Sequence, residues 1–170
     1  GATVSGGGGG GGSNGNEASA TYATVGGGRR NLASATESTI GGGDTNTASG
    51  PQSTVSGGDG NTSSGSYSTV GGGDSNDSND EGTTVAGGSA NTAGSGGGGT
   101  GDWATVAGGA NNAAFGEYST IGGGLSNNAI GDYAVIGGGA DNTASGPDYS
   151  TIAGGQLNSA TADYATIGGG

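Results

Sequence analysis

The chain has 170 residues and a formal net charge of −12, with two arginines and no lysine, histidine or cysteine. Valine, isoleucine, leucine and phenylalanine occupy only 17 positions, whereas glycine occupies 48. This is too little apolar surface for a conventional globular core, because ordering each residue costs about 1 to 2 kcal/mol of backbone entropy. The acidic charge disfavours nucleic-acid partners, and without an apolar run of roughly 20 residues we expect no membrane insertion of this segment.

From Val4 onward, a β-branched residue followed by small residues, mostly glycine, recurs along the chain. The intervals are 21, 15, 15, 15, 15, 21, 15, 15, 16 and 15 residues. Residues 1–170 therefore form a single array of 15-residue repeats, with glycine-rich loop insertions at 6–12 and 94–101. We predict that the core is formed by Val25, Ile40, Val55, Val70, Val85, Val106, Ile121, Ile136, Ile152 and Ile167.

Two other residue types keep the same register. An asparagine lies six residues after most core positions, namely Asn31, Asn46, Asn61, Asn76, Asn91, Asn112, Asn127, Asn142 and Asn158. Three residues before the core position an aromatic residue is common, namely Tyr22, Tyr67, Trp103, Tyr118, Tyr133, Tyr149 and Tyr164. Such regularity is not expected of a disordered chain.

A 15-residue repeat is too short for a helix pair and fits two short strands joined by two tight turns. The first strand is expected in the Tyr-Ala/Ser-Thr-Val segment and the second around Asn-x-Ala, with the glycines in a turn. Because side chains alternate along a strand, the threonine and the tyrosine should share the outward face. The predicted fold is all-β: a parallel β-solenoid, or β-roll, of about 15 residues per rung, two short strands per rung and about 11 rungs.

The repeat units at 67–76 and 133–146 resemble the head repeats of trimeric autotransporter adhesins, in which an apolar-Gly pair is followed at a fixed offset by Ala-x-Gly. They are also similar to repeats of phage tail-fibre-like proteins. The resemblance covers nearly the whole chain. It implies a parallel β-roll that associates side by side as a homotrimer on a cell surface.

Two sets of acidic residues are candidate Ca²⁺ ligands. Carboxylates on adjacent rungs, about 5 Å apart, repel by roughly 1 kcal/mol in water, and a divalent cation with oxygen ligands would relieve this. Alternatively, the acids lie at solvated turns and keep a fibre soluble. Four residues before the core position are Asp102, Glu117, Asp132, Asp148 and Asp163, and four residues after it are Asp44, Asp59 and Asp74.

The remaining columns leave alternatives open. The asparagines are better explained as a rung-to-rung amide ladder than as a calcium-binding nonapeptide roll, because that motif has aspartate where asparagine stands here. The aromatic residues could bind carbohydrate or stack on one another. The threonine before each core residue suggests an ice-binding face, although its expected companion rank is bulky Tyr, Trp, Glu or Gln.

These observations favour a structural role. Without histidine, cysteine or lysine, catalysis would rest on carboxylates alone, and no pair of them is placed for it, so we expect no enzyme. The preferred hypothesis is an extracellular or cell-surface fibrous protein, the rod or head of an adhesin or fibre. It would self-associate as a homotrimer and contact host or matrix surfaces or glycans. The alternatives are a head-to-tail filament subunit and an ice-binding or carbohydrate-binding solenoid, with no cofactor apart from the Ca²⁺ considered above.

Overall fold

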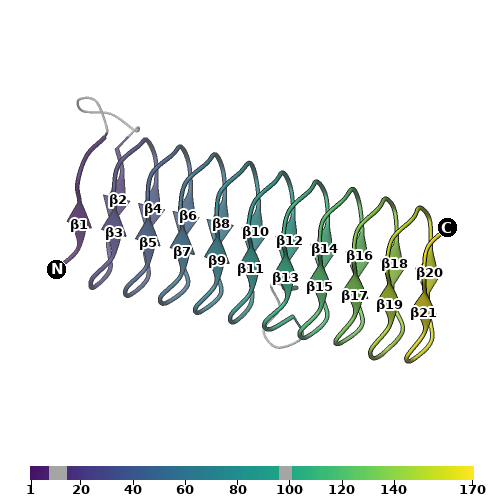
Figure 1. The fold of residues 1–170 in the computed structure, drawn as a ribbon. Helices are drawn as coiled ribbons and strands as arrows, with labels where there is room; N and C mark the ends of the chain where they lie inside the picture. The colour runs from purple at the N-terminus through teal and green to yellow at the C-terminus, as the bar shows by residue number, and fades with distance from the viewer. Residues whose placement is uncertain (8–14, 96–100) are drawn as a thin grey trace.

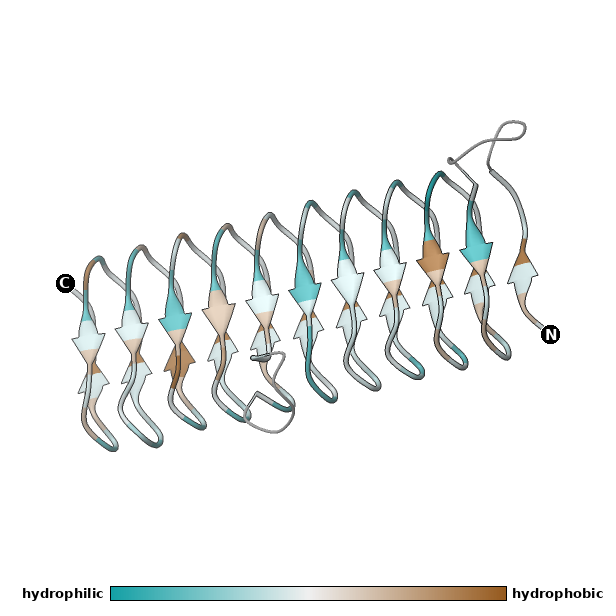
Figure 2. Ribbon diagram, turned by 180° about the vertical axis from the view of Figure 1, so that it is seen from behind, coloured by the Kyte–Doolittle hydropathy of each residue, from teal (hydrophilic) through white to brown (hydrophobic). Residues whose placement is uncertain are grey.

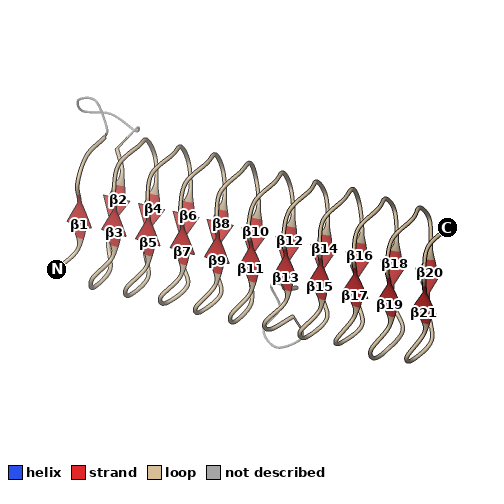
Figure 3. Cartoon of the chain, in the orientation of Figure 1, coloured by secondary structure: helices blue, strands red, loops and turns tan. Residues whose placement is uncertain are grey.

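The structure is a computed structural model that describes residues 1–7, 15–95 and 101–170. The chain winds into a rod of successive rungs, with its two termini at opposite ends (Figure 1). Each complete rung gives one two-residue strand to each of two parallel sheets, and longer turns connect the strands (Figure 3). The predicted parallel β-solenoid is confirmed.

The described strands alternate between the two sheets along the sequence. The first sheet has eleven strands, β1 (Thr3–Val4), β3 (Thr24–Val25), β5 (Thr39–Ile40), β7 (Thr54–Val55), β9 (Thr69–Val70), β11 (Thr84–Val85), β13 (Thr105–Val106), β15 (Thr120–Ile121), β17 (Val135–Ile136), β19 (Thr151–Ile152) and β21 (Thr166–Ile167). The second has ten, β2 (Glu17–Ala18), β4 (Leu32–Ala33), β6 (Thr47–Ala48), β8 (Thr62–Ser63), β10 (Asp77–Ser78), β12 (Thr92–Ala93), β14 (Ala113–Ala114), β16 (Asn128–Ala129), β18 (Thr143–Ala144) and β20 (Ser159–Ala160).

Equivalent positions of consecutive repeats pair directly, so each column of the repeat becomes a line of side chains along the rod. Val25 pairs with Ile40, and Val85 pairs with Val106 although 21 residues separate them. The longer intervals are thus accommodated outside the strands. Residues 8–14 and 96–100, which include most of the insertions expected at 6–12 and 94–101, lie outside the described residues.

The first strand of each rung is shorter than the sequence suggests. Tyr67 belongs to the preceding turn, with φ of 60°, and its N–H donates to the carbonyl oxygen of Pro51 in the previous rung at 2.9 Å. The N–H of the strand residue Thr69 instead donates to the carbonyl oxygen of Thr83 in the next rung at 2.9 Å. The expectation that tyrosine and threonine share one face of a strand is therefore wrong, because the left-handed backbone at the tyrosine reverses the direction of its N–H.

The core lies between the two sheets. The first sheet contributes the Val or Ile column and a small residue two positions earlier, and the second contributes the asparagine column and an Ala or Ser two positions later. Nine of the ten predicted core residues are 0% exposed, and Ile167 in the last rung is partly buried. Burying one such side chain contributes about 1.5 to 3 kcal/mol, so hydrogen bonds between rungs must supply much of the remaining stability.

The apolar core is interrupted midway along the rod. Ser63 Oγ lies 2.6 Å from Ser68 Oγ, and Ser78 Oγ donates to the carbonyl oxygen of Thr83 at 2.8 Å. These buried residues separate two apolar clusters, one on each side. Because the hydroxyls find partners inside the core, the interruption leaves none of these four groups unsatisfied.

Candidate functional site

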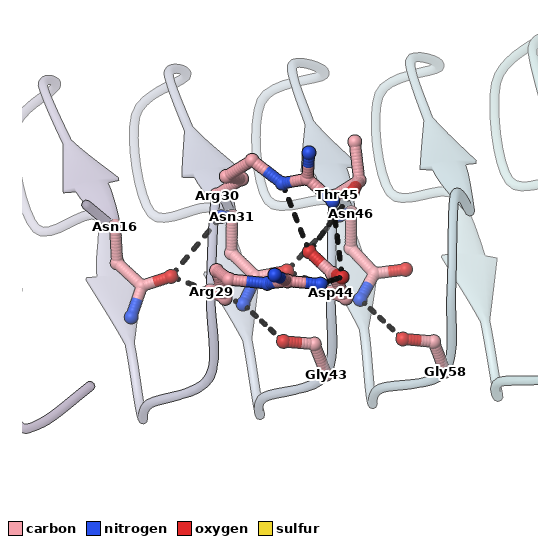
Figure 4. A network of polar contacts seen from close by, with 9 residues as sticks. All are labelled: Asn16, Arg29, Arg30, Asn31, Gly43, Asp44, Thr45, Asn46 and Gly58. Carbon is pink, nitrogen blue, oxygen red and sulfur yellow. Dashed lines mark hydrogen bonds and ion pairs between the residues drawn. The ribbon is translucent and has the colours of Figure 1, made fainter. Parts of the chain in front are cut away.

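The asparagine column forms a continuous hydrogen-bond ladder at the turn that leads from the first sheet to the second. The backbone N–H and the Nδ2 of Asn46 donate to Asn31 Oδ1 at 3.0 and 3.1 Å (Figure 4). Asn46 Nδ2 also donates to the carbonyl oxygens of Gly42 and Gly58 at 3.0 and 2.9 Å. The same contact to the preceding rung is made by Asn31, Asn61, Asn76, Asn91, Asn112, Asn127, Asn142 and Asn158.

The ladder begins one rung earlier than predicted, at Asn16. Asn16 Oδ1 accepts hydrogen bonds from the backbone N–H and Nδ2 of Asn31 at 3.0 and 3.1 Å. Asn16 lies twelve rather than six residues after Val4, because the first insertion falls between them, so the spacing rule missed it. The Asn-x-Ala pattern at 16–18 is the signal that could have identified it.

Both arginines of the chain pair with one carboxylate. Arg29 Nη2 bonds to Asp44 Oδ2, and Arg30 donates from Nε and Nη2 to Asp44 Oδ1 and Oδ2 at 3.2 and 3.1 Å (Figure 4). Hydrogen bonds from Arg30 and Arg29 hold the pKa of the Asp44 carboxyl well below its usual range. Asp44, a candidate cation ligand, therefore already has its counter-charges within the chain.

The other acids at this turn follow Asp44 in register, and the backbones of Asp44, Asp59 and Asp74 form consecutive parallel bridges. The second acidic column lies at the opposite turn, where carboxylates accept hydrogen bonds from backbone N–H groups of the preceding rung. These hydrogen bonds are Glu81 N to Asp102 Oδ1 (3.1 Å), Glu117 N to Asp132 Oδ1 (2.9 Å) and Asp148 N to Asp163 Oδ1 (3.2 Å). Among the described residues, no three acidic side chains are grouped in a way that could hold a metal ion.

Four tyrosines near the C-terminus stack into one exposed column. The ring centroids of Tyr118 and Tyr133, Tyr133 and Tyr149, and Tyr149 and Tyr164 are 5.1, 4.7 and 5.3 Å apart, with interplanar angles of 15°, 10° and 5°. Partial burial in the stack, with smaller contributions from Tyr149 and nearby acids, raises the pKa of Tyr133. Stacking covers both faces of the two central rings, so a sugar would reach only their edges and hydroxyls.

The aromatic column is discontinuous in the first half of the rod. Glu37 and Gln52 occupy the equivalent positions between Tyr22 and Tyr67, and Gln52 Nε2 donates to Glu37 Oε2 at 2.7 Å. In the rung after Tyr67 the equivalent position is Gly82, and the indole of Trp103 lies over it. A Cβ on Gly82 would come within 2.4 Å of that ring. Among the aromatic residues that the structure describes, only the four C-terminal tyrosines therefore form an uninterrupted stack.

The outer face of the first sheet carries no charged side chain, and we call it the threonine face. One rank, the residue before each core position, is threonine in every strand of this sheet except β17, where Val135 replaces it and the strand is brown in Figure 2. The bulky companion rank expected beside the threonines is absent, since the aromatic residues lie in the turn. The second rank, one residue after the core position, consists of exposed Ser5, Gly26, Gly41, Ser56, Gly71, Ala86, Ala107, Gly122, Gly137, Ala153 and Gly168.

Two comparisons with known proteins bear on the identity of the chain. No protein-family model matches the chain, and no curated protein is significantly similar to it. No pocket is present in the described part of the rod. Nor does any helix there have the length and apolar character needed to cross a bilayer. The resemblance to adhesin head repeats stays a prediction.

The outer face of the second sheet carries two acids, the exposed Glu17 and the half-buried Asp77. Asp77 is half-buried in β10, between Thr62 and Thr92 of the neighbouring strands. Burial raises the pKa of the Asp77 carboxyl, and a hydrogen bond from Thr62 offsets this only in part. Because the folded state binds this proton more tightly than the unfolded state, ionisation of Asp77 costs stability above its folded pKa, and the cost vanishes below the unfolded value of about 3.9.

Asp77→Thr, which restores the residue found in neighbouring strands, is therefore expected to raise the melting temperature at pH 7 by about 1 to 2 °C. The gain should shrink as the pH falls from the folded pKa toward about 4 and should be lost below it, where the aspartate becomes neutral in both states. Thermal melts followed by circular dichroism between pH 3 and pH 7 measure this difference. Asp59→Ser removes the same charge from an exposed turn and controls for net charge; a gain for Asp77→Thr that does not change with pH would contradict the explanation.

Proposed function

We propose that the chain is the rod or head of an extracellular or cell-surface adhesin or fibre, and that its copies associate side by side through the threonine face. The observation that carries the proposal is the composition of that face. Neither of its outward ranks contains a charged side chain along the eleven strands of the first sheet, although the chain has a net charge of −12. Like charges oppose the approach of identical copies, whereas small uncharged side chains allow two sheets to pack closely.

The second sheet is less suited to such an interface. Its outward strand positions include Glu17 and Asp77, and the side chains vary from Ala113 to Leu32. Copies that met through this sheet would bring like charges together. The contrast between the two sheets favours the threonine face, and the resemblance to trimeric adhesin heads favours a trimer.

Such an assembly leaves the turns exposed. The acidic columns and the tyrosine stack lie at these turns, where they keep the fibre solvated and are available to host or matrix surfaces or glycans. The rod itself supplies length and rigidity, since the asparagine ladder runs from Asn16 to Asn158.

The test compares two lysine substitutions within one rung. Thr84 lies in β11 on the threonine face, and Thr92 lies in β12 on the second sheet, with both side chains half-buried. The unmodified chain should have about three times the 15.3 kDa mass of one copy by light scattering. Thr84→Lys should raise the dissociation constant at least tenfold, because introduced lysines on neighbouring copies repel one another. Thr92→Lys should leave the mass unchanged.

Three outcomes would contradict this assignment. A chain that stays monomeric at all concentrations has no side-by-side partner in itself. Equal weakening by the two substitutions would mean that the threonine face is not the interface. A mass that grows continuously with concentration would indicate the head-to-tail filament instead.

The threonine face also supports a second candidate function, binding to ice. Its threonines repeat at the strand spacing of about 4.8 Å, and the rank beside them is small rather than bulky. For this function the chain should be monomeric and should depress the freezing point below the melting point of ice. Thr84→Lys should abolish this thermal hysteresis, and Thr92→Lys should retain it.

A further inference from the structure

We propose that the stacked tyrosines Tyr118, Tyr133, Tyr149 and Tyr164 are a site of oxidative modification, at which dityrosine bonds join neighbouring rungs of the same chain. The co-reactant is a one-electron oxidant of the peroxidase and hydrogen peroxide class. The product would be a covalent cross-link along one corner of the rod, independent of how copies of the chain associate.

The stacked rings are close enough to couple. Neighbouring ring centroids in the stack are 4.7 to 5.3 Å apart, so a phenoxyl radical formed on one ring meets its partner without diffusion. The backbone holds this arrangement, since each tyrosine N–H donates to a backbone carbonyl oxygen of the preceding rung. Tyr133 N donates to the carbonyl oxygen of Glu117 at 2.7 Å, and Tyr149 N donates to that of Asp132 at 2.9 Å.

The stack is also accessible from solvent. The four side chains are 40% to 71% exposed, so an oxidant can reach their edges and hydroxyls. Because they are exposed, the rings can also tilt from the parallel arrangement to the twisted geometry of a biaryl bond. Tyrosines buried in a core would offer neither.

The chain has few other side chains that compete for a one-electron oxidant. The sequence contains no cysteine and no methionine, and it has one tryptophan and six tyrosines. One-electron oxidation is therefore directed to these aromatic residues. Trp103 lies in the rung before Tyr118, so a radical formed by oxidation of the indole is close to the stack.

Formation of each dityrosine bond is a two-electron oxidation. Each of two phenols loses one electron and its hydroxyl proton, giving two phenoxyl radicals. Their ortho carbons form one carbon–carbon bond, and the two ring hydrogens at those carbons move to the oxygens, which restores both phenols. Hydrogen peroxide accepts the two electrons and two protons and becomes two molecules of water.

The test uses the full chain at high dilution, treated with peroxidase and hydrogen peroxide. The expected result is dityrosine fluorescence in monomer-sized material, a mass lower by two hydrogens for each bond, and cross-linked peptides that contain Tyr133 or Tyr149. The double substitution Tyr133→Phe with Tyr149→Phe keeps aromatic rings in the column but leaves no two adjacent tyrosines. It should lower intramolecular dityrosine at least tenfold.

The matched control is Tyr22→Phe with Tyr67→Phe, which removes two tyrosines that have no stacked tyrosine neighbour in the structure. This variant should form as much dityrosine as the unmodified chain. The proposal would be overturned by equal yields from the two double variants, by dityrosine found only between chains, or by none in the unmodified chain. Circular dichroism of each variant verifies that the rod is folded.

Discussion

Gly58→Ala is expected to remove about 3 to 5 kcal/mol of stability, whereas Gly57→Ala should change it by less than about 1 kcal/mol. Gly58 has a φ of +94°, and a Cβ there would lie 2.2 Å from the carbonyl oxygen of Gly73 and 2.6 Å from Asn61 Nδ2. Gly57 is adjacent in the same turn, yet its nearest neighbour would be Gly42 O at 3.8 Å. The two substitutions add the same methyl group, so the difference isolates the backbone conformation and the close approach of the next rung.

The measurement must allow for the repetitive architecture. Each rung contacts mainly its neighbours, so a damaged interface can open without unfolding the whole rod. Urea denaturation gives the overall loss, and amide hydrogen exchange should show it concentrated around Gly58 and the rung of Gly73. Equal destabilisation by both alanines would show that the rungs are not packed as closely as the structure has them.

The second large effect is expected at the asparagine ladder, where Asn112→Asp should cost about 3 to 5 kcal/mol. Asn112 is 1% exposed, and its Nδ2 donates to Asn91 Oδ1, Gly108 O and Gly124 O at 3.1, 3.0 and 3.0 Å. A carboxylate has no hydrogen to donate, and its charge would face three oxygens that are hydrogen-bond acceptors. The buried charge would then have no compensation on that side.

The adjacent Asn111 provides a matched control. Asn111 is exposed with φ of 54°, and Asp141 occupies the equivalent position two rungs later. Asn111→Asp adds the same charge to the surface and should change stability by less than about 0.5 kcal/mol. Thermal melts at neutral and acidic pH check both variants, and the Asn112→Asp defect should lessen in acid, when the introduced carboxyl regains a proton. A neutral effect of Asn112→Asp at pH 7 would mean that the ladder contributes little.

Core and ladder positions could be predicted from sequence because they depend on register alone. Once Val or Ile recurs every 15 residues, parallel pairing stacks equivalent positions, and an inward residue in one rung is inward in the next. Residues two positions apart then share a face, which places Asn46 and Ala48 beside Ile40 in the core. The inward positions can therefore be predicted from the repeat length alone, without the conformation of the turns.

The turns could not be predicted in the same way. Positive φ is uncommon for residues other than glycine, and bulky or β-branched side chains are least expected there, yet Thr45 and Trp103 have φ of 59° and 60°. Their backbone N–H groups bond to the preceding rung, and this long-range contact favours the conformation. Because a local sequence carries no trace of that contact, sequence reasoning places the aromatic column in a strand and does not identify the small companion rank of the threonine face.

The winding of the chain also determines how the rod would respond to tension. Each rung advances the rod by about 4.8 Å, but its 15 residues have an extended length of about 50 Å. The hydrogen bonds between rungs run along the rod axis, so a pull on its two ends loads all the bonds of one interface together. When an interface opens, the 15 residues of the released rung extend from about 4.8 Å to about 50 Å, roughly a tenfold increase. The rungs on either side stay wound. A rod built this way is stiff at low force and extensible at high force, and it lengthens one rung at a time.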